Sequence, residues 1–412
     1  MSTVAVRRLD LRQTFTALKY PNFRLWFLGQ VVSLFGTWMQ NTAQGFLIYE
    51  LTRSPAYLGY VGFANGLPSW LFMLAGGVAA DRISRRNLMV ITQSSMMGLA
   101  FILAGLTFSG TVQPWHVLVL ALGLGISNAF DAPARLALVP ELVDRQDLTN
   151  AIALNGTMFN LATIIGPAAG GVVYALFGPG WCFTINGITF LAVIAALLLM
   201  KMPPRPALVR RISPVTQIQE GLRFVINHRT VLALISLVGA VGMFGISFIV
   251  LLPAWAVEVL NGDATTTGIL RSAQGVGALL AALWIASLGR FNYRGKLMTY
   301  GTFFFPAMLF SLSFVRDLPL SLLLIGGVGL AVVLINNLDN SLVQDSVPDE
   351  LRGRVMSIFS LTFFGTMPVG SFLLGLLAEK YNEMIALRIG SLGMFLCASL
   401  VWLLAPKVRK LE

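Results

Sequence analysis

The chain has 412 residues, of which 56% are hydrophobic and 11% are charged, and its formal net charge is +11. Average soluble domains are about 45–50% apolar and about 25% charged, so this chain has too few charges to cover a water-facing surface. We therefore expect an integral membrane protein whose apolar surface faces lipid. Two cysteines (Cys182, Cys397) and two histidines (His116, His228) are too few and too isolated for a disulfide framework or a metal site, so no metal or cofactor is predicted.

Hydropathy predicts twelve membrane spans along the chain, because each apolar segment approaches the roughly 20 residues that cross a bilayer. The polar, basic stretch 1–19 precedes them and shows no cleavable signal peptide. The predicted spans are 23–48, 55–79, 87–109, 114–134, 150–176, 181–201, 230–256, 266–288, 296–315, 318–338, 355–378 and 384–405.

The basic residues predict the orientation of these spans. If the N-terminus is cytoplasmic, the outer side receives only Arg53, Arg316 and Lys380, while Arg271 and Arg388 lie within spans. All other basic residues then lie inside, which is the bias of membrane proteins toward positive cytoplasmic loops. The bias favours an even span count and two cytoplasmic termini. It also accounts for the net charge without a nucleic-acid partner.

The sequence predicts two six-helix bundles joined by a linker: 1–202, 203–228 and 229–412. Prolines at 203, 204 and 206 end the sixth span, and Val215, Ile218, Leu222 and Val225 then recur at helical spacing. This stripe favours a short amphipathic helix on the cytoplasmic membrane surface, with a disordered linker as the alternative.

The two halves also resemble each other. Asp131 precedes Pro140 by nine residues, Asp339 precedes Pro348 by nine, and Arg85 matches Arg294. A repeat of six plus six spans in one orientation is typical of a large class of secondary transporters.

The loop after the second span reads Gly77-Val-Ala-Ala-Asp81-Arg82-Ile-Ser-Arg85-Arg86. It resembles the signature loop of the major facilitator superfamily. The resemblance implies a cytoplasmic latch in which Asp81 faces the N-terminal end of span eleven and Arg85 pairs with Asp131, holding the outward-facing state. The alternative is a basic loop with no special role. The predicted latch residues are Gly77, Asp81, Arg82, Arg85, Arg86, Asp131, Arg135, Asp339 and Asp345.

The second half departs from the latch pattern, because Arg290 stands where Asp81 would align. In span five, Gly166-Pro167-Ala-Ala-Gly170-Gly171 resembles the end of the antiporter motif of exporting branches, with Ala153 and Ala162 in place of two upstream glycines. The resemblance favours export, while the alternative is a helix-packing face.

Other segments resemble a bacterial branch of the superfamily that contains the enterobactin exporter. They are Tyr20-Pro-Asn-Phe-Arg24, Trp38-Met-Gln40, Glu220-Gly-Leu-Arg223 and Arg352-Gly-Arg354-Val-Met356.

By this resemblance, spans one, four, seven and ten line the substrate cavity. Polar side chains are costly against lipid, so their positions predict the cavity face, with helix–helix hydrogen bonding as the alternative. The predicted cavity residues are Gln30, Thr37, Gln40, Asn41, Gln44, Arg271, Gln274, Asn336 and Asn337. Three roles are open for Arg271: holding an anionic substrate, pairing with Glu258, or reaching the outer surface.

No Asp or Glu lies in the middle third of a predicted span, which weighs against proton coupling. No nucleotide-binding loop and no catalytic constellation is visible, so an enzyme is not expected. The sequence predicts a monomeric exporter in the bacterial inner membrane. It would move a siderophore or drug by alternating access, with proton antiport as the leading energy source. The alternatives are a lysolipid flippase and a facilitative transporter without proton coupling.

Overall fold

The computed structural model describes residues 15–202, 214–289 and 291–411. These residues fold into helices, with no strand among them. The main elements in chain order are η1 (Thr16–Lys19), α2 (Pro21–Thr52), α3 (Pro55–Arg82), α4 (Arg85–Phe108), α5 (Pro114–Leu138), η2 (Val139–Glu141), η3 (Arg145–Asp147), α6 (Leu148–Phe177), α7 (Pro179–Leu199), α8 (Pro214–Asn227), α9 (Arg229–Ala240), η4 (Val241–Gly245), η5 (Ile246–Leu251), α10 (Leu252–Ala254), η6 (Trp255–Val259), α11 (Ala264–Leu288), α12 (Arg294–Leu312), α13 (Leu318–Ser346), α14 (Asp349–Lys380), α15 (Glu383–Leu404) and η7 (Val408–Lys410).

Local sequence explains where many of these helices begin. Pro21, Pro55 and Pro114 each stand in the first turn of a helix, where the missing N–H of proline costs nothing. The side chains of Asp317 and Asn382 accept hydrogen bonds from the first turns of α13 and α15. The residues that start these helices therefore mark where the preceding apolar segment ends.

Each predicted span coincides with one helix, except that the seventh is a run of short helical pieces from α9 to η6. Ten helical segments of the described chain are long and apolar enough to cross a membrane, and α2 and α12 are not among them. The chain is therefore an all-helical, multi-pass protein. Twelve crossings and the cytoplasmic position of both termini remain predictions.

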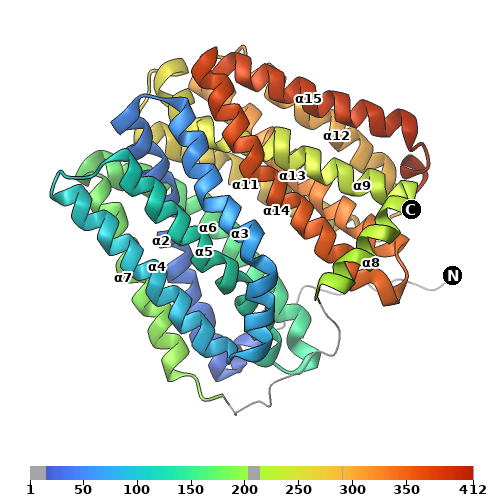
Figure 1. Ribbon diagram of the computed structural model, residues 1–412, viewed down its shortest axis with the longest axis horizontal. Coiled ribbons are helices and arrows are strands. Elements are labelled where there is room, and N and C mark those ends of the chain that lie inside the picture. Colours follow the sequence, from blue (N-terminus) through green and yellow to red (C-terminus); the bar gives the residue numbers. More distant parts are fainter. Residues whose placement is uncertain (1–14, 203–213, 290, 412) are drawn as a thin grey trace.

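Separate hydrophobic clusters hold the two sets of helices together. Trp26, Met89 and Phe190 belong to a cluster built from α2 to α7, whereas Trp255 and Phe305 belong to one built from η4 to α15. Figure 1 shows α2–α7 on one side of the molecule and α9–α15 on the other, with α3 and α14 side by side where they meet. The division at 203–228 stays a proposal that this arrangement supports.

Helix α8 lies in the predicted linker, whose residues 203–213 are outside the described part of the chain, as are 1–14. It packs against α14, where Gly221 touches Arg354 and Ile358, and Val225 is buried. Glu220 and Arg354 form an ion pair across this contact. Leu222 is 46% exposed. One side of α8 therefore joins the second set of helices, and an apolar residue remains on the other.

Candidate substrate cavity

A cavity of about 590 Å³ lies between the two sets of helices. Its walls come from α2, α3 and α6 on one side and from η5, α11, α13 and α14 on the other. This volume falls in the range of about 300–1,000 Å³ typical of small-molecule sites. The site therefore belongs to neither half alone, as a site used in alternating access requires.

Most of the wall is apolar, with aromatic side chains such as Trp38, Phe159 and Phe364. A few polar groups interrupt it, which is the composition that fixes the orientation of an amphiphilic ligand. The polar lining residues are Asn41, Gln44, Asn65, Ser69, Asn160, Thr163, Arg271, Gln274 and Ser371.

Arg271 is the charged residue of this wall. Its guanidinium reaches across the interface, because Nη2 lies 3.7 Å from the Cβ position that a side chain on Gly45 would occupy. Among the residues that the structure describes, Arg271 forms no ion pair or hydrogen bond, and its Nε is buried without a partner. Glu258 accepts a hydrogen bond from Tyr49. Of the three predicted roles, contact with a cavity ligand fits this placement best.

The structure places three of the nine predicted cavity residues with Arg271 in the wall: Asn41, Gln44 and Gln274. Gln40 is buried and accepts a hydrogen bond from Asn186 Nδ2 at 2.7 Å, so it joins α2 to α7. Gln30 is also buried, away from the cavity.

Three further predicted residues do not line the cavity. Thr37 donates to the carbonyl of Ser33, one turn earlier in α2. Asn336 donates to the carbonyl of Val332, and Asn337 is exposed. Bonding within the same helix satisfies Thr37 and Asn336 without a ligand.

The fourth span does not line this cavity, contrary to the prediction. No described residue of α5 belongs to the wall, and the second, fifth, eighth and eleventh spans contribute instead. The reason is that α3 packs closely on α5, with the Cβ position of Gly125 only 2.1 Å from the carbonyl oxygen of Asn65. Asn65 and Gly66 of α3 then occupy the wall in front of α5.

Hydrogen bonds between the two halves close the end predicted to face outward. The Tyr49 hydroxyl donates to Glu258 at 2.7 Å, and the Ser54 hydroxyl donates to Glu379 at 2.6 Å. The backbone N–H of Ala56 also donates to Glu379, at 3.3 Å. Sequence analysis named Glu258 only as a possible partner of Arg271 and missed the other residues, because the bonded residues lie far apart in the chain and follow no motif.

The opposite ends of the two halves diverge (Figure 1). Trp70 of α3 still packs against Gly365 of α14, but a Cβ added to Gly77 or Gly353, nearer the predicted cytoplasmic ends, would meet open space. With the predicted orientation, this is an inward-facing arrangement.

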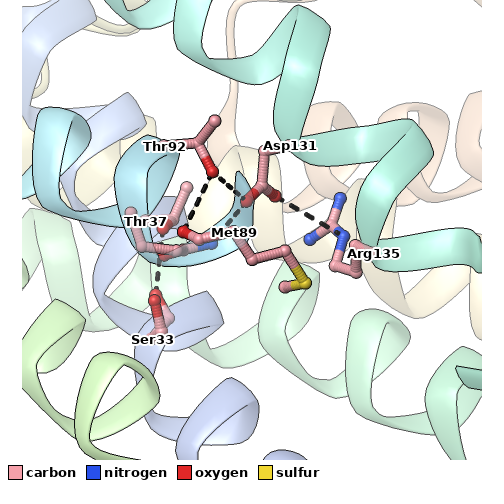
Figure 2. A network of polar contacts seen from close by, with 7 residues as sticks. Ser33, Thr37, Met89, Thr92, Asp131 and Arg135 are labelled. Carbon is pink, nitrogen blue, oxygen red and sulfur yellow. Dashed lines mark hydrogen bonds and ion pairs between the residues drawn. The ribbon is translucent and has the colours of Figure 1, made fainter. Parts of the chain in front are cut away.

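The expected pair between Arg85 and Asp131 does not form in this arrangement. Arg85 donates to the carbonyl of Ala137 at 2.8 Å and forms an ion pair with Glu141. Asp131 is buried and accepts hydrogen bonds from Thr92 and Gln93, both at 2.9 Å (Figure 2). Glu141 lies in the helical turn that follows α5, closer than Asp131 to the start of α4 where Arg85 sits, and it takes the guanidinium.

The other latch residues keep their places near the predicted cytoplasmic ends. Arg135 lies 3.9 Å from Asp131, and Arg86 donates to the carbonyls of Leu198 and Met200. Asp81 is partly exposed and Arg82 is exposed at the end of α3. Whether they form a latch in the outward-facing state stays a prediction.

In the second half, Arg294 bonds Asp345 and Ser341, both at 2.8 Å. Asp339 lies one helical turn and a half earlier in α13 and is completely buried. Arg290, the departure from the latch pattern, lies outside the described residues.

The antiporter-like motif forms packing surfaces on α6. A Cβ on Gly166 or Gly170 would collide with Trp38 or Met39 of α2, and one on Gly171 would lie 2.5 Å from the carbonyl oxygen of Ala264 in α11. A Cβ on Gly268 of α11 would in turn lie 2.4 Å from the carbonyl oxygen of Pro167. The motif therefore lets α6 approach one helix of each half.

Comparison with known proteins agrees with this architecture. The family model described as "Transmembrane secretion effector" matches residues 12–412. The staphyloferrin A transporter of Staphylococcus aureus is 25% identical, over 94% of this chain and 97% of that protein. The enterobactin exporter of Citrobacter koseri is 26% identical, over 95% and 93%. The crystal structure of the nucleoside transporter NupG superposes with a TM-score of 0.71 over 94% of this chain and 98% of that chain, at 16% identity, which shows a shared fold.

Proposed function

Because this chain belongs to the transmembrane secretion effector family of major facilitator transporters, we propose that it exports a small amphiphilic anion, such as a siderophore, from the bacterial cytoplasm. It would work by alternating access in the inner membrane as a monomer. Proton antiport is the proposed energy source. The two helix sets on either side of 203–228 would be the moving units.

The placement of Arg271 carries the substrate proposal. A guanidinium in an apolar wall attracts a ligand carboxylate or other anionic oxygen strongly, because apolar surroundings screen the attraction between opposite charges only weakly. The amides of Gln44, Gln274 and Asn41 line the same cavity and offer both donors and acceptors to the rest of a polar ligand. The aromatic wall would hold the apolar part.

The export direction rests on two observations. The cavity is closed by hydrogen bonds at the end predicted to face outward, so a ligand would enter from the cytoplasm. In addition, two curated relatives bear the names of siderophore transporters, one of them an exporter.

The test is transport by purified protein in proteoliposomes, with staphyloferrin A and enterobactin as anionic probes and the cationic dye ethidium for comparison. Arg271→Gln should reduce uptake of an anionic probe at least ~10-fold, since a charge-assisted bond worth about 1.5–3 kcal/mol is lost. Arg271→Lys should retain part of it. Arg388→Gln is the matched control, because Arg388 contacts Ser313 and Phe314 outside the cavity. Equal losses for anionic and cationic probes would refute the anion site.

The predominantly apolar wall favours a second candidate, a lysolipid flippase. The same proteoliposomes distinguish the two with a fluorescent lysolipid. Movement of that lipid between leaflets, without transport of either siderophore, would replace the exporter proposal.

A further inference from the structure

The internal repeat places two aspartates at matching positions in very different surroundings. Asp131 of α5 and Asp339 of α13 each precede a proline by nine residues. Asp131 has two hydrogen-bond donors and an arginine beside it (Figure 2). Asp339 is 0% exposed, and neither carboxyl oxygen has a hydrogen-bond partner anywhere in residues 15–202, 214–289 and 291–411.

The sequence shows why Asp339 lacks the hydrogen-bond and charge partners that Asp131 has. In register with Arg85 and Arg294, Thr92 and Gln93 match Gly301 and Thr302 of α12. Glycine has no donor side chain, and the Thr302 hydroxyl donates to the carbonyl of Thr299 instead. Val343 stands where Arg135 would align and belongs to a hydrophobic cluster with Leu338 and Leu342. Asp339 therefore lies in an apolar environment, unlike Asp131 at the matching position of the first half.

No charged side chain among the described residues compensates for this burial. The helices packed on α13 are α9, α11, α12 and α14, and none of their charged groups interacts with Asp339. Among the charged groups of these four helices, Arg229, Lys296 and Glu350 are exposed, and Arg271 lines the cavity. The others have partners elsewhere: Arg294 bonds Asp345, Arg352 bonds Asp349, Arg354 bonds Glu220, Glu379 bonds Ser54, and Lys380 lies over the ring of Tyr381.

An ionised carboxylate without a partner is the costliest group to bury, and a neutral carboxyl is far cheaper. We infer that Asp339 carries a proton in this inward-facing state and couples proton movement to transport, an inference that rests on the proposed antiport function. When the proton leaves, the O–H electron pair stays on the carboxylate and the proton passes to cytoplasmic water. The carboxylate then needs a cation or water, which requires the helix contacts around α13 to change.

Arg294 is the cation best placed to pair with the ionised carboxylate of Asp339. It begins α12 and holds Asp345 on the same helix as Asp339. It also matches Arg85, the arginine that the superfamily resemblance assigns to the aspartate of the first half. A shift of Arg294 from the exposed Asp345 to Asp339 would link deprotonation to a movement of α12 against α13.

Infrared spectroscopy tests the proton directly and needs no substrate. Purified protein at pH 7 should show a carbonyl band of a protonated carboxylic acid, part of which shifts on carboxyl-¹³C labelling of aspartate. Asp339→Asn should remove the shifting component, and Asp317→Asn, the same change at the exposed residue that caps the N-terminus of α13, should leave it. An unchanged component in Asp339→Asn, or no aspartate-dependent component in the wild type, overturns the inference. The labelling result holds even if Asp339→Asn does not fold.

Proteoliposomes then test the coupling, with enterobactin and staphyloferrin A as probes. Asp339→Asn should still exchange a probe across the membrane at equal pH, but should lose the stimulation that an acid lumen gives to wild-type uptake. Stimulation equal to the wild type overturns the coupling role. Wild-type protein that exchanges neither probe would instead count against the proposed function and leaves the infrared result to decide the protonation of Asp339.

Discussion

The hydrogen bond from Tyr49 to Glu258 offers a direct test of how the end predicted to face outward is closed. Tyr49 is almost completely buried in α2, whereas Glu258 at the end of the broken seventh segment is exposed. A hydrogen bond to a charged group contributes about 1.5–3 kcal/mol. Water can replace part of the hydrogen bond that the exposed Glu258 carboxylate loses, so we expect Tyr49→Phe to weaken the closure by about 1 kcal/mol. Such a change shifts the ratio of inward-facing to outward-facing molecules about fivefold toward the outward-facing state.

Pulsed electron paramagnetic resonance can measure this shift. Spin labels at Ser109 and Arg316, which lie on exposed connections at the end predicted to face outward, report the separation of the two halves there in a background without Cys182 and Cys397. Tyr49→Phe should increase the long-distance population. Tyr57→Phe is the matched control, because the Tyr57 hydroxyl makes no hydrogen bond to any described residue and its ring packs edge to face against Tyr60. Identical distance distributions for wild type, Tyr49→Phe and Tyr57→Phe would refute the reasoning.

Two further predictions concern helix packing and buried polar groups. Gly171→Ala places a Cβ 2.5 Å from the carbonyl oxygen of Ala264, so the same labels should show the outer ends forced apart, at a cost of about 1–3 kcal/mol. Gly156→Ala, which meets open space on the same helix, should change nothing. Gln40→Leu should lower the melting temperature, since Asn186 loses a bond of about 0.6–2 kcal/mol, while leaving substrate preference intact. Asn41→Leu should change substrate preference and leave the melting temperature intact. If both variants changed the same one of these two properties, the division between structural and cavity residues would be wrong.

Hydropathy located the helices well because many of the apolar runs are separated by a proline or a polar cap that starts the next helix. It could not foresee that the seventh segment breaks after Ala240 into π and 3-10 turns. Gly242 and Gly245 lie in this break with Thr366 and Phe305 close against them, a contact between distant segments that no local pattern records.

The cavity was harder to predict than the fold, and α2 shows why. Its polar residues mark which sides of the helix avoid lipid, but burial against another helix and exposure to a cavity satisfy that condition equally. Gln40 meets Asn186 of α7, whereas its neighbour Asn41 faces the cavity. Only the position of α7 separates the two cases. Arg271 was a candidate because a guanidinium within a span is rare. Arg388 also lies within a predicted span but contacts Ser313 and Phe314 outside the cavity, so only the structure separates the two arginines.

The glycine contacts indicate which helices move together. Within the halves, Gly76 and Gly125 bring α3 and α5 into contact at the carbonyls of Ala129 and Asn65, and Gly277 and Gly329 do the same for α11 and α13. These two pairs are equivalent in the internal repeat. Backbone-close crossings leave no room for sliding, because any lateral shift brings a carbonyl oxygen onto a Cα.

The contacts between the halves differ from these internal crossings. At Gly59 and Gly171 the approach is also close, but it ends before Gly77 and Gly353, and it is supplemented by the exposed carboxylates of Glu258 and Glu379. Solvent can replace hydrogen bonds of that kind when the helices part. We therefore expect α3 to move with α5 and away from α14, and α11 to move with α13 and away from α6. Rigid halves that separate along these two seams would open the cavity outward without repacking either core.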